Sequence, residues 1–330
     1  MHPVILAIES SCDETSASVI QHGKVLNNVI ASQTVHHKYG GVVPELASRA
    51  HQQHILDVVN EAMTTAGILP SSLHAIALMG SLLVGVSFAK GMALALGIPL
   101  IEVNHMEAHV LAHFISDPKP SFPFLCLTVS GGHTQLVKVK DYLDMEVIGE
   151  TQDDAVGEAF DKAAKIMGLP YPGGPMIDEY AKEGNPKAYS FPDTAMQGLN
   201  FSFSGIKTAF LYFLRDKLAE NAAFIEENRN DICASLQSHL ISMLMQKLRR
   251  AANETGIKQI AIAGGVAANS GLRGAIRDAA EKNRWEVFIP DLQYCTDNAA
   301  MIAMAAHYKF LQNKFTTLDV APVANLSIGI

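Results

Sequence analysis

The sequence predicts a two-lobed α/β fold, and three observations support this prediction. The 330 residues suggest roughly two domains, and a hydrophobic fraction of 48% is ample for a large buried core. Apolar segments with strand character alternate with segments of helical periodicity, which is typical of layered α/β proteins. Two distant segments repeat one strand–turn–strand design, which indicates duplicated lobes.

The repeated design is a buried strand, a small polar turn and a second strand. At one fixed offset, Ser11 matches Ser130. Thr15 matches Thr134 at the same offset. The expected segments are a strand at residues 4–8, a turn at 9–14 and strands at 15–20 and 25–30, then a strand at 124–129, a turn at 130–133 and a strand at 134–139.

The remaining elements follow from helical spacing of apolar residues and from Gly or Pro at the ends of these patterns. The motif Gly173-Gly-Pro175 opens one helix, because proline is tolerated in a first helical turn. We expect further helices at residues 47–66, 82–96, 155–167, 231–254, from about 269, and 298–311, with strands at 75–78, 100–103 and 259–263.

Composition narrows the classes of function. The net charge of −8 argues against a strong nucleic-acid binder unless a partner or a local patch supplies basic groups. The apolar runs are too short to span a membrane, and residues 1–9 lack the basic flank of a signal peptide. Four separated cysteines without a C-x-x-C pair favour a reducing cytoplasm.

Two histidines form the first candidate site. In a helix, His105 and His109 would lie on one face, at the i,i+4 spacing that lets both bind one metal ion. Asp297 could add a carboxylate, and such a set suits iron(II) or zinc. A structural histidine pair is the alternative. A zinc protease is excluded, because Met106 stands where that enzyme class needs glutamate.

Glycine-rich turns form the second candidate site. In Ser130-Gly-Gly-His-Thr134, paired glycines after a buried strand let the backbone approach a ligand closely. The segment Gly264-Gly-Val-Ala-Ala-Asn269 follows a strand and opens a helix, where a ribose or phosphate could bind. Asn269 could equally be an ordinary N-cap. Asp161 and Asp178 could accept hydrogen bonds from hydroxyl groups, although Asp178 also suits the helix dipole.

The first turn carries two further candidates, Asp13 and Glu14, in the motif Glu9-Ser-Ser-Cys-Asp-Glu-Thr15. A carboxylate in such a turn can hold a metal ion or position a nucleophile. The alternative is an ordinary acidic turn.

Taken together, these motifs resemble the TsaD family, the tRNA N6-adenosine threonylcarbamoyltransferases, over nearly the whole chain. The matching motifs are Glu9-Ser-Ser-Cys-Asp-Glu-Thr15, Gly40-Gly-Val-Val-Pro-Glu-Leu-Ala-Ser-Arg49, Asn104-His-Met-Glu-Ala-His109, Ser130-Gly-Gly-His-Thr134, Phe160-Asp-Lys162, Gly173-Gly-Pro175, Phe201-Ser-Phe-Ser-Gly205, Gly264-Gly-Val-Ala-Ala-Asn269 and Thr296-Asp-Asn298.

The resemblance implies an actin-like fold of the sugar kinase, Hsp70 and actin superfamily. We expect residues 1–110 with 299–330 to form one lobe and 111–298 the other, with the ligands bound between them. It also implies transfer of threonylcarbamoyl from threonylcarbamoyl-AMP to N6 of the adenosine 3′ to the tRNA anticodon, position 37. The implied site residues are metal ligands His105, His109 and Asp297, adenylate-binding residues Thr128, Val129, Ser130, Gly131, Gly132, Asp161, Gly174, Asp178 and Asn269, and Asp13 with Glu14 at the reacting centre.

The resemblance further implies one divalent cation per chain, with iron(II) favoured over zinc. A TsaB-like paralogue and a TsaE-like ATPase are the expected partners, and they would help an acidic chain to handle tRNA. One departure is a Gly-Pro-Gly loop that bacterial members carry after the strand at 75–78. This sequence is about six residues shorter there. Either the protein truly lacks the loop or, as we favour, the protein has the loop and the sequence leaves it out.

Two other functions remain open at this stage. A small-molecule kinase or ATPase of the same superfamily would turn over Mg-ATP and leave the histidine pair idle. A non-catalytic scaffold should have lost the metal ligands, yet all three candidates are present.

Overall fold

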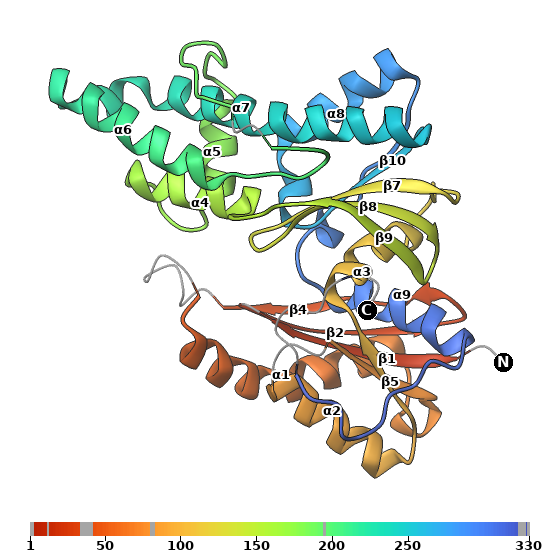
Figure 1. Ribbon diagram of the computed structural model, residues 1–330. Helices are drawn as coiled ribbons and strands as arrows, with labels where there is room; N and C mark the ends of the chain where they lie inside the picture. Colours follow the sequence, from red (N-terminus) through yellow and green to blue (C-terminus); the bar gives the residue numbers. More distant parts are fainter. Residues whose placement is uncertain are drawn as a thin grey trace. The chain divides into compact units, whose positions relative to one another are not determined.

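The computed structural model describes residues 3–11, 13–33, 42–79, 83–193, 196–322 and 328. The chain separates into two compact units, each built on its own sheet (Figure 1). Unit 1 comprises residues 1–120, 140–145 and 290–330, and unit 2 comprises residues 121–139 and 146–289. The lobe boundaries expected from the sequence, at 110/111 and 298/299, stay a prediction.

The sheet of unit 1 has the strand order β3-β2-β1-β5-β6, and β4 also pairs with β2. Strand β1 is antiparallel to β2 and parallel to β5, and β5 is parallel to β6. The strands are β1 (Val4–Ser11), β2 (Glu14–Gln21), β3 (Lys24–Val25), β4 (Val29–Ser32), β5 (Ala75–Met79) and β6 (Leu100–Val103).

Helices cover both faces of this sheet (Figure 1). One face packs against α1 (Pro44–Ala66) and α2 (Leu83–Leu96) through an apolar core that includes Leu6 and Ile8. The other face packs against α9 (Ala299–Leu311), which also contacts the short helix α3 (His105–Leu111). Residues alternate between the two faces along β1, so that every second side chain points toward α9.

The sheet of unit 2 has the order β11-β10-β7-β8-β9, and it repeats the pairing pattern of unit 1. Strand β7 is antiparallel to β8 and parallel to β10, as β1 is to β2 and β5. The duplication predicted from the sequence is therefore confirmed. The strands are β7 (Phe124–Val129), β8 (Thr134–Asp141), β9 (Asp144–Glu150), β10 (Gln259–Ala263) and β11 (Glu286–Phe288).

The helices of unit 2 pack on one another and on this sheet around fully buried aromatic side chains such as Phe160 and Phe203. The longest, α7, is bent at Asn228, whose backbone dihedral angles are not helical. The helices are α4 (Val156–Ile166), α5 (Gly173–Ala181), α6 (Ser204–Glu220), α7 (Phe224–Thr255) and α8 (Ser270–Asn283).

Several expectations about elements need correction. The first turn is shorter than residues 9–14, because β1 runs to Ser11 and β2 begins at Glu14, which pair with each other. The strand expected at 25–30 is two short strands, β3 and β4. The sequence did not predict β9, β11 or α6. The position of the missing Gly-Pro-Gly loop borders residues 80–82, which lie outside the described residues.

None of the helices in the described ranges combines the length and the apolar composition that a membrane crossing requires.

Candidate functional site

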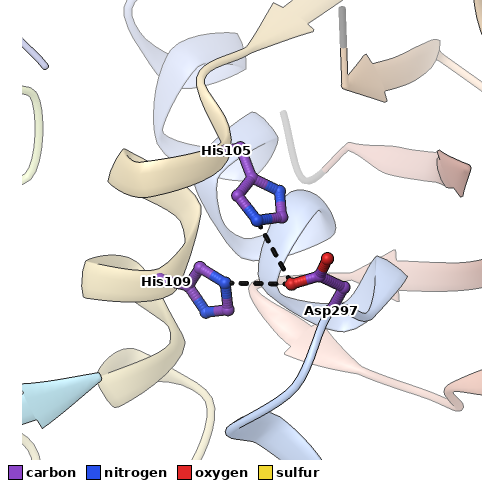
Figure 2. A group of neighbouring side chains, drawn as sticks. All are labelled: His105, His109 and Asp297. Atoms are coloured by element: carbon purple, nitrogen blue, oxygen red, sulfur yellow. Dashed lines mark hydrogen bonds and ion pairs between the residues drawn. The ribbon is translucent and has the colours of Figure 1, made fainter. Parts of the chain in front are cut away.

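Two histidines and one aspartate from distant parts of the chain meet in unit 1 (Figure 2). His105 and His109 lie on α3, and Asp297 stands just before Asn298, the N-cap residue of α9. The Nε2 atoms of both imidazoles lie 3.2 Å from Oδ1 of Asp297. The ligand atoms of this cluster all lie within 4.8 Å of one another.

Both helix starts that carry the cluster are fixed by asparagine caps. The side chain of Asn104 accepts hydrogen bonds from the backbone amides of Met106 and Glu107, so α3 begins at His105. Asn298 caps α9 in the same way at Met301. Because α3 starts in a defined register, its two imidazoles lie one turn apart and meet edge to face, with ring centroids separated by 4.7 Å.

Burial and charge set the protonation of these groups. Burial favours neutral forms, yet the negative charge of Asp297 and its hydrogen bond outweigh this and raise the pKa of His105 well above 6.5. Burial likewise would raise the pKa of Asp297, but the two histidines hold it well below 3.8. The pKa of His109 is lowered, because it is fully buried and lies beside His105.

The cluster fits a bound cation on three counts. Ligands held about 2.0–2.2 Å from one ion lie roughly 3.3 Å apart, close to the 3.2 Å seen here between nitrogen and oxygen. Two imidazoles and one carboxylate are a donor set for iron(II) or zinc. Both carboxylate oxygens of Glu9, which lies beside His105, are also buried without a hydrogen-bond partner among the described residues. A buried negative charge of this kind is costly unless a positive charge compensates it.

The turn between β1 and β2 borders this cluster. The hydroxyl of Ser11 donates a hydrogen bond to Oδ2 of Asp297. Burial, and then the negative charges of Asp297, Asp13 and Glu9, raise the pKa of Glu14 to about 8. The backbone carbonyl of Asp13 accepts a hydrogen bond from the amide of Gln33, which ties the turn to the end of β4. Glu14 therefore lies close enough to the cluster for the charge of Asp297 to act on it.

In unit 2, the glycine-rich turn after β7 is enclosed by close backbone contacts. A Cβ atom on Gly157 would lie 2.5 Å from the carbonyl oxygen of Ser130. One on Gly264 would lie 2.4 Å from the carbonyl oxygen of Val129. The turn itself leaves open space beside Gly131 and Gly132, where a ligand could approach the backbone. Thr128 is buried in β7, and its hydroxyl donates to the carbonyl of Gln135.

The expected adenylate-binding aspartates make internal hydrogen bonds. One oxygen of Asp161 accepts from the backbone amides of Gly173 and Gly174, at the start of α5. Burial nevertheless raises the pKa of Asp161. Asp178, on α5, accepts from the amide and the hydroxyl of Ser270, on α8. The first carboxylate ties α4 to the start of α5, and the second ties α5 to the start of α8.

Asn269 has a structural role that the sequence left open. Its side-chain oxygen accepts from the amide of Leu272 and caps α8. Its side-chain nitrogen donates to Oε1 of the buried Gln237, at 2.7 Å. The N-cap interpretation is confirmed, and contact with a ligand stays a prediction.

Comparison with known proteins identifies the family. The family model for TsaD, tRNA N6-adenosine threonylcarbamoyltransferase, matches residues 24–304. The chain belongs to this family.

Named members of the TsaD family align with this chain over nearly its full length. The protein named tRNA N6-adenosine threonylcarbamoyltransferase in Cytophaga hutchinsonii is 62% identical, over 100% of this chain and 98% of that relative. The proteins of the same name in Christiangramia forsetii and Porphyromonas gingivalis are 59% and 57% identical. These alignments cover 96% and 98% of this chain, and the same shares of those two relatives.

Solved structures support the actin-like α/β fold of this TsaD family member. Full-length HypF in a phosphate- and nucleotide-bound form has a TM-score of 0.64 at 12% identity, over 94% of this chain and 46% of that one. HypF from T. kodakarensis has a TM-score of 0.61 at 14% identity, over 96% of this chain and 49% of that one. These two likenesses concern the fold alone.

Two carboxylates in this TsaD family member were not singled out from the sequence. Asp153 accepts hydrogen bonds from the hydroxyl of Ser202 and from the amides of Phe203 and Ser204, and so caps α6 from about fifty residues away. No local pattern signals that contact. Glu9 lies in β1 beside His105. The sequence did contain a sign of its importance, because an acidic residue stands where the alternation of the strand requires a buried side chain.

Proposed function

We propose that this chain transfers the threonylcarbamoyl group from threonylcarbamoyl-AMP to N6 of the adenosine at position 37 of tRNA. The observation that carries the proposal is the identity of 57–62% to relatives named for this transfer, over nearly their full lengths. Membership of the TsaD family makes the chain a transferase that acts in tRNA modification.

His105, His109 and Asp297 are the proposed ligands of one divalent cation, with iron(II) favoured and zinc possible. The supporting observations are the 3.2 Å approach of both Nε2 atoms to one carboxylate oxygen and the buried carboxylate of Glu9 beside His105, which has no hydrogen-bond partner among the described residues. Bound there, the cation would supply Lewis-acid polarisation of an acyl oxygen. The protein's contribution is geometric, because two capped helices fix the three donors in place.

Asp13 and Glu14 are the proposed acid–base groups. The attacking amine of adenosine is a weak nucleophile, so holding it in line with the acyl carbon carries much of the rate. Asp13 would accept the amine proton or orient that amine. Burial and the neighbouring carboxylates raise the pKa of Glu14 to about 8 in the metal-free protein, and in its protonated form Glu14 would donate a hydrogen bond to the leaving phosphate.

The proposed adenylate site is the end of β7 and the turn that follows it, together with four residues from other elements. Its residues are Thr128, Val129, Ser130, Gly131 and Gly132, with Asp161, Gly174, Asp178 and Asn269. Its open glycines would let backbone amides meet a phosphate. Asp161 and Asp178 keep lone pairs beyond their internal hydrogen bonds and can still accept from ribose hydroxyls.

We further propose that the chain works in the cytoplasm with a TsaB-like paralogue and a TsaE-like ATPase. The net charge of −8 supports the need for partners, because an acidic protein gains little from counterion release on tRNA.

The test is a transfer assay with a direct chemical readout. The protein, its partners, tRNA, threonylcarbamoyl-AMP and iron(II) are incubated, and tRNA nucleosides are analysed by mass spectrometry. We expect threonylcarbamoyladenosine to form with the wild-type chain and not with His109→Ala. Modification by a folded His109→Ala protein without metal would overturn the metal assignment. Turnover of Mg-ATP on a small molecule, without tRNA modification, would favour the kinase alternative.

A further inference from the structure

Glu9 is a buried carboxylate that the proposed ligand set and the proposed acid–base pair do not use. It lies in β1, where every residue is buried, and its side chain is 0% exposed. Neither of its carboxylate oxygens has a hydrogen-bond partner among the described residues. A buried charge in this state is costly unless another charge compensates it.

The register of the sheet explains where Glu9 points. Along β1, Leu6 and Ile8 face the core shared with α1 and α2, so Glu9 faces the opposite side, toward α9. Its partner across the β1–β2 pair is Ser16, whose buried hydroxyl also has no hydrogen-bond partner among the described residues. Apolar residues fill this face nearer the start of β1, and the polar groups begin at Glu9.

The group that Glu9 meets is the imidazole of His105. Oε2 of Glu9 lies 3.6 Å from Nδ1 of His105, while Nε2 of the same ring lies 3.2 Å from Asp297. One imidazole therefore stands between two carboxylates, one at each nitrogen. Figure 2 shows its other side, where Nε2 of His105 points at Asp297 alongside His109. The 3.6 Å contact would become a hydrogen bond after a shift of roughly 0.5 Å.

We propose that Glu9 is a positioning residue for the cation site: its carboxylate accepts a hydrogen bond from Nδ1–H of His105 and holds Nε2 toward the cation. The inference rests on the cation site proposed above. Histidine ligands commonly donate their second ring N–H to a carboxylate, which fixes both the ring orientation and the tautomer. Glu9 also places one more negative charge within the same buried region, where a dication would compensate it.

The roles of the two histidines then differ. His105 has a carboxylate behind it, whereas Nδ1 of His109 is buried without a hydrogen-bond partner in the described part of the chain. The loss of Glu9 should consequently disturb one ligand and leave the other in place. The variant should therefore still bind the cation, but with lower affinity and a changed ligand geometry.

The test compares Glu9→Gln with Glu107→Gln, a matched control. Glu107 lies on α3 between the two ligands, but its carboxylate points to Lys309, 3.8 Å away. Both changes remove one negative charge and keep the side-chain size. Affinity for Co²⁺ is measured by competition with a chelator, and the visible spectrum of the Co²⁺-loaded protein reports the ligand geometry. We expect Glu9→Gln to bind roughly 10- to 100-fold more weakly with a changed spectrum. Glu107→Gln should match the wild type.

Thermal unfolding separates positioning from a merely structural role. Without metal, Glu9→Gln should unfold at or above the wild-type temperature, because the single imidazolium of His105 cannot balance both Glu9 and Asp297. Added Co²⁺ should raise the unfolding temperature of the wild type more than that of the variant. A purely structural Glu9 would instead lower the unfolding temperature of the metal-free variant and leave the affinity unchanged, which overturns the proposal.

Two further outcomes are distinguishable. If the wild type binds no Co²⁺ stoichiometrically, the cation site itself fails, and with it the role of Glu9. If Glu9→Gln does not fold, Glu9→Asp serves in its place, because it keeps the charge but withdraws the carboxylate from the ring. Wild-type affinity and an unchanged spectrum in Glu9→Asp would then refute the positioning role.

Discussion

The hydroxyl of Ser11 donates a hydrogen bond of 3.1 Å to Oδ2 of Asp297, across 286 positions of the chain. This bond leaves Oδ1 of Asp297 for the two histidines. Strand β1 thereby fixes the orientation of a carboxylate that belongs to the start of α9.

Replacing this serine should weaken the cation site without dismantling it. Ser11→Ala removes one partner of a partly buried carboxylate, which costs about 1 kcal/mol, or roughly fivefold in Co²⁺ affinity. Chelator competition measures the effect. The control is Ser10→Ala, which deletes a hydroxyl on the opposite face of β1, where it packs against Gly85. Equal affinities for the two variants would contradict the prediction.

The pair of His105 and Asp297 predicts how the stability of the metal-free protein depends on pH. The folded pKa of His105 lies well above 6.5, because Asp297 outweighs the effect of burial. Its contribution to stability is complete below about pH 6.5 and is lost as pH rises through the folded pKa. The folded pKa of Asp297 lies well below 3.8, so its contribution is lost only as pH falls through that lower value.

Urea unfolding with a chelator, from about pH 5 to about pH 9, measures this dependence. Wild-type stability should fall relative to Asp297→Asn as the pH rises above about 6.5, since the variant cannot hold the imidazolium. Parallel pH profiles for the two proteins would count against the pairing.

Asp153 should stabilise unit 2 as the cap of α6. Asp153→Ala removes an acceptor for two backbone amides, and we expect a loss of about 1 kcal/mol in the free energy of unfolding. Asp153→Asn should lose less, because its amide oxygen still accepts. The hydrogen bonds lower the pKa of Asp153 against the effect of burial, so its contribution is present above about pH 3.8 and lost at lower pH. Urea unfolding at pH 7 and pH 3 checks both statements.

Alanine substitutions at Gly264 and at its neighbour Gly265 should differ strongly in their effect on stability. It has a φ of +90°, and a Cβ there would lie 2.4 Å from the carbonyl oxygen of Val129. Gly264→Ala should destabilise unit 2 by about 2 kcal/mol or more. Gly265→Ala should be nearly neutral, because within the described part of the chain only its own neighbours along the backbone come within 4 Å of the added carbon. Similar unfolding temperatures for the two variants would refute the steric argument.

Local sequence patterns predicted most of the strands and helices. Strands such as β1 and β7 are continuous apolar runs, and the helical positions of His105 and His109 follow from a spacing of four residues. The sequence could suggest Asp297 as their partner but not its distance, because that depends on how α9 packs against β1. Asp153 was missed for the same reason: a cap reaching about fifty residues leaves no trace in periodicity.

Glu9 differs, because its signal was readable. A strand that places Ile5 and Ala7 on one buried face must place residue 9 there too. The turn expected at residues 9–14 placed Glu9 outside the strand and left Asp13 and Glu14 as the candidate carboxylates. The error in the turn boundary thus concealed the carboxylate that faces Nδ1 of His105.

The eight residues that open α9, from 299 to 306, are all buried, and Asp297 sits just ahead of them. A chain still emerging from the ribosome cannot assemble the three-residue cluster until α9 has been synthesised and docked against the first strands. At the proposed cation site, the complete ligand set would therefore form only late in synthesis, and a product truncated before residue 297 would be left with a histidine pair only.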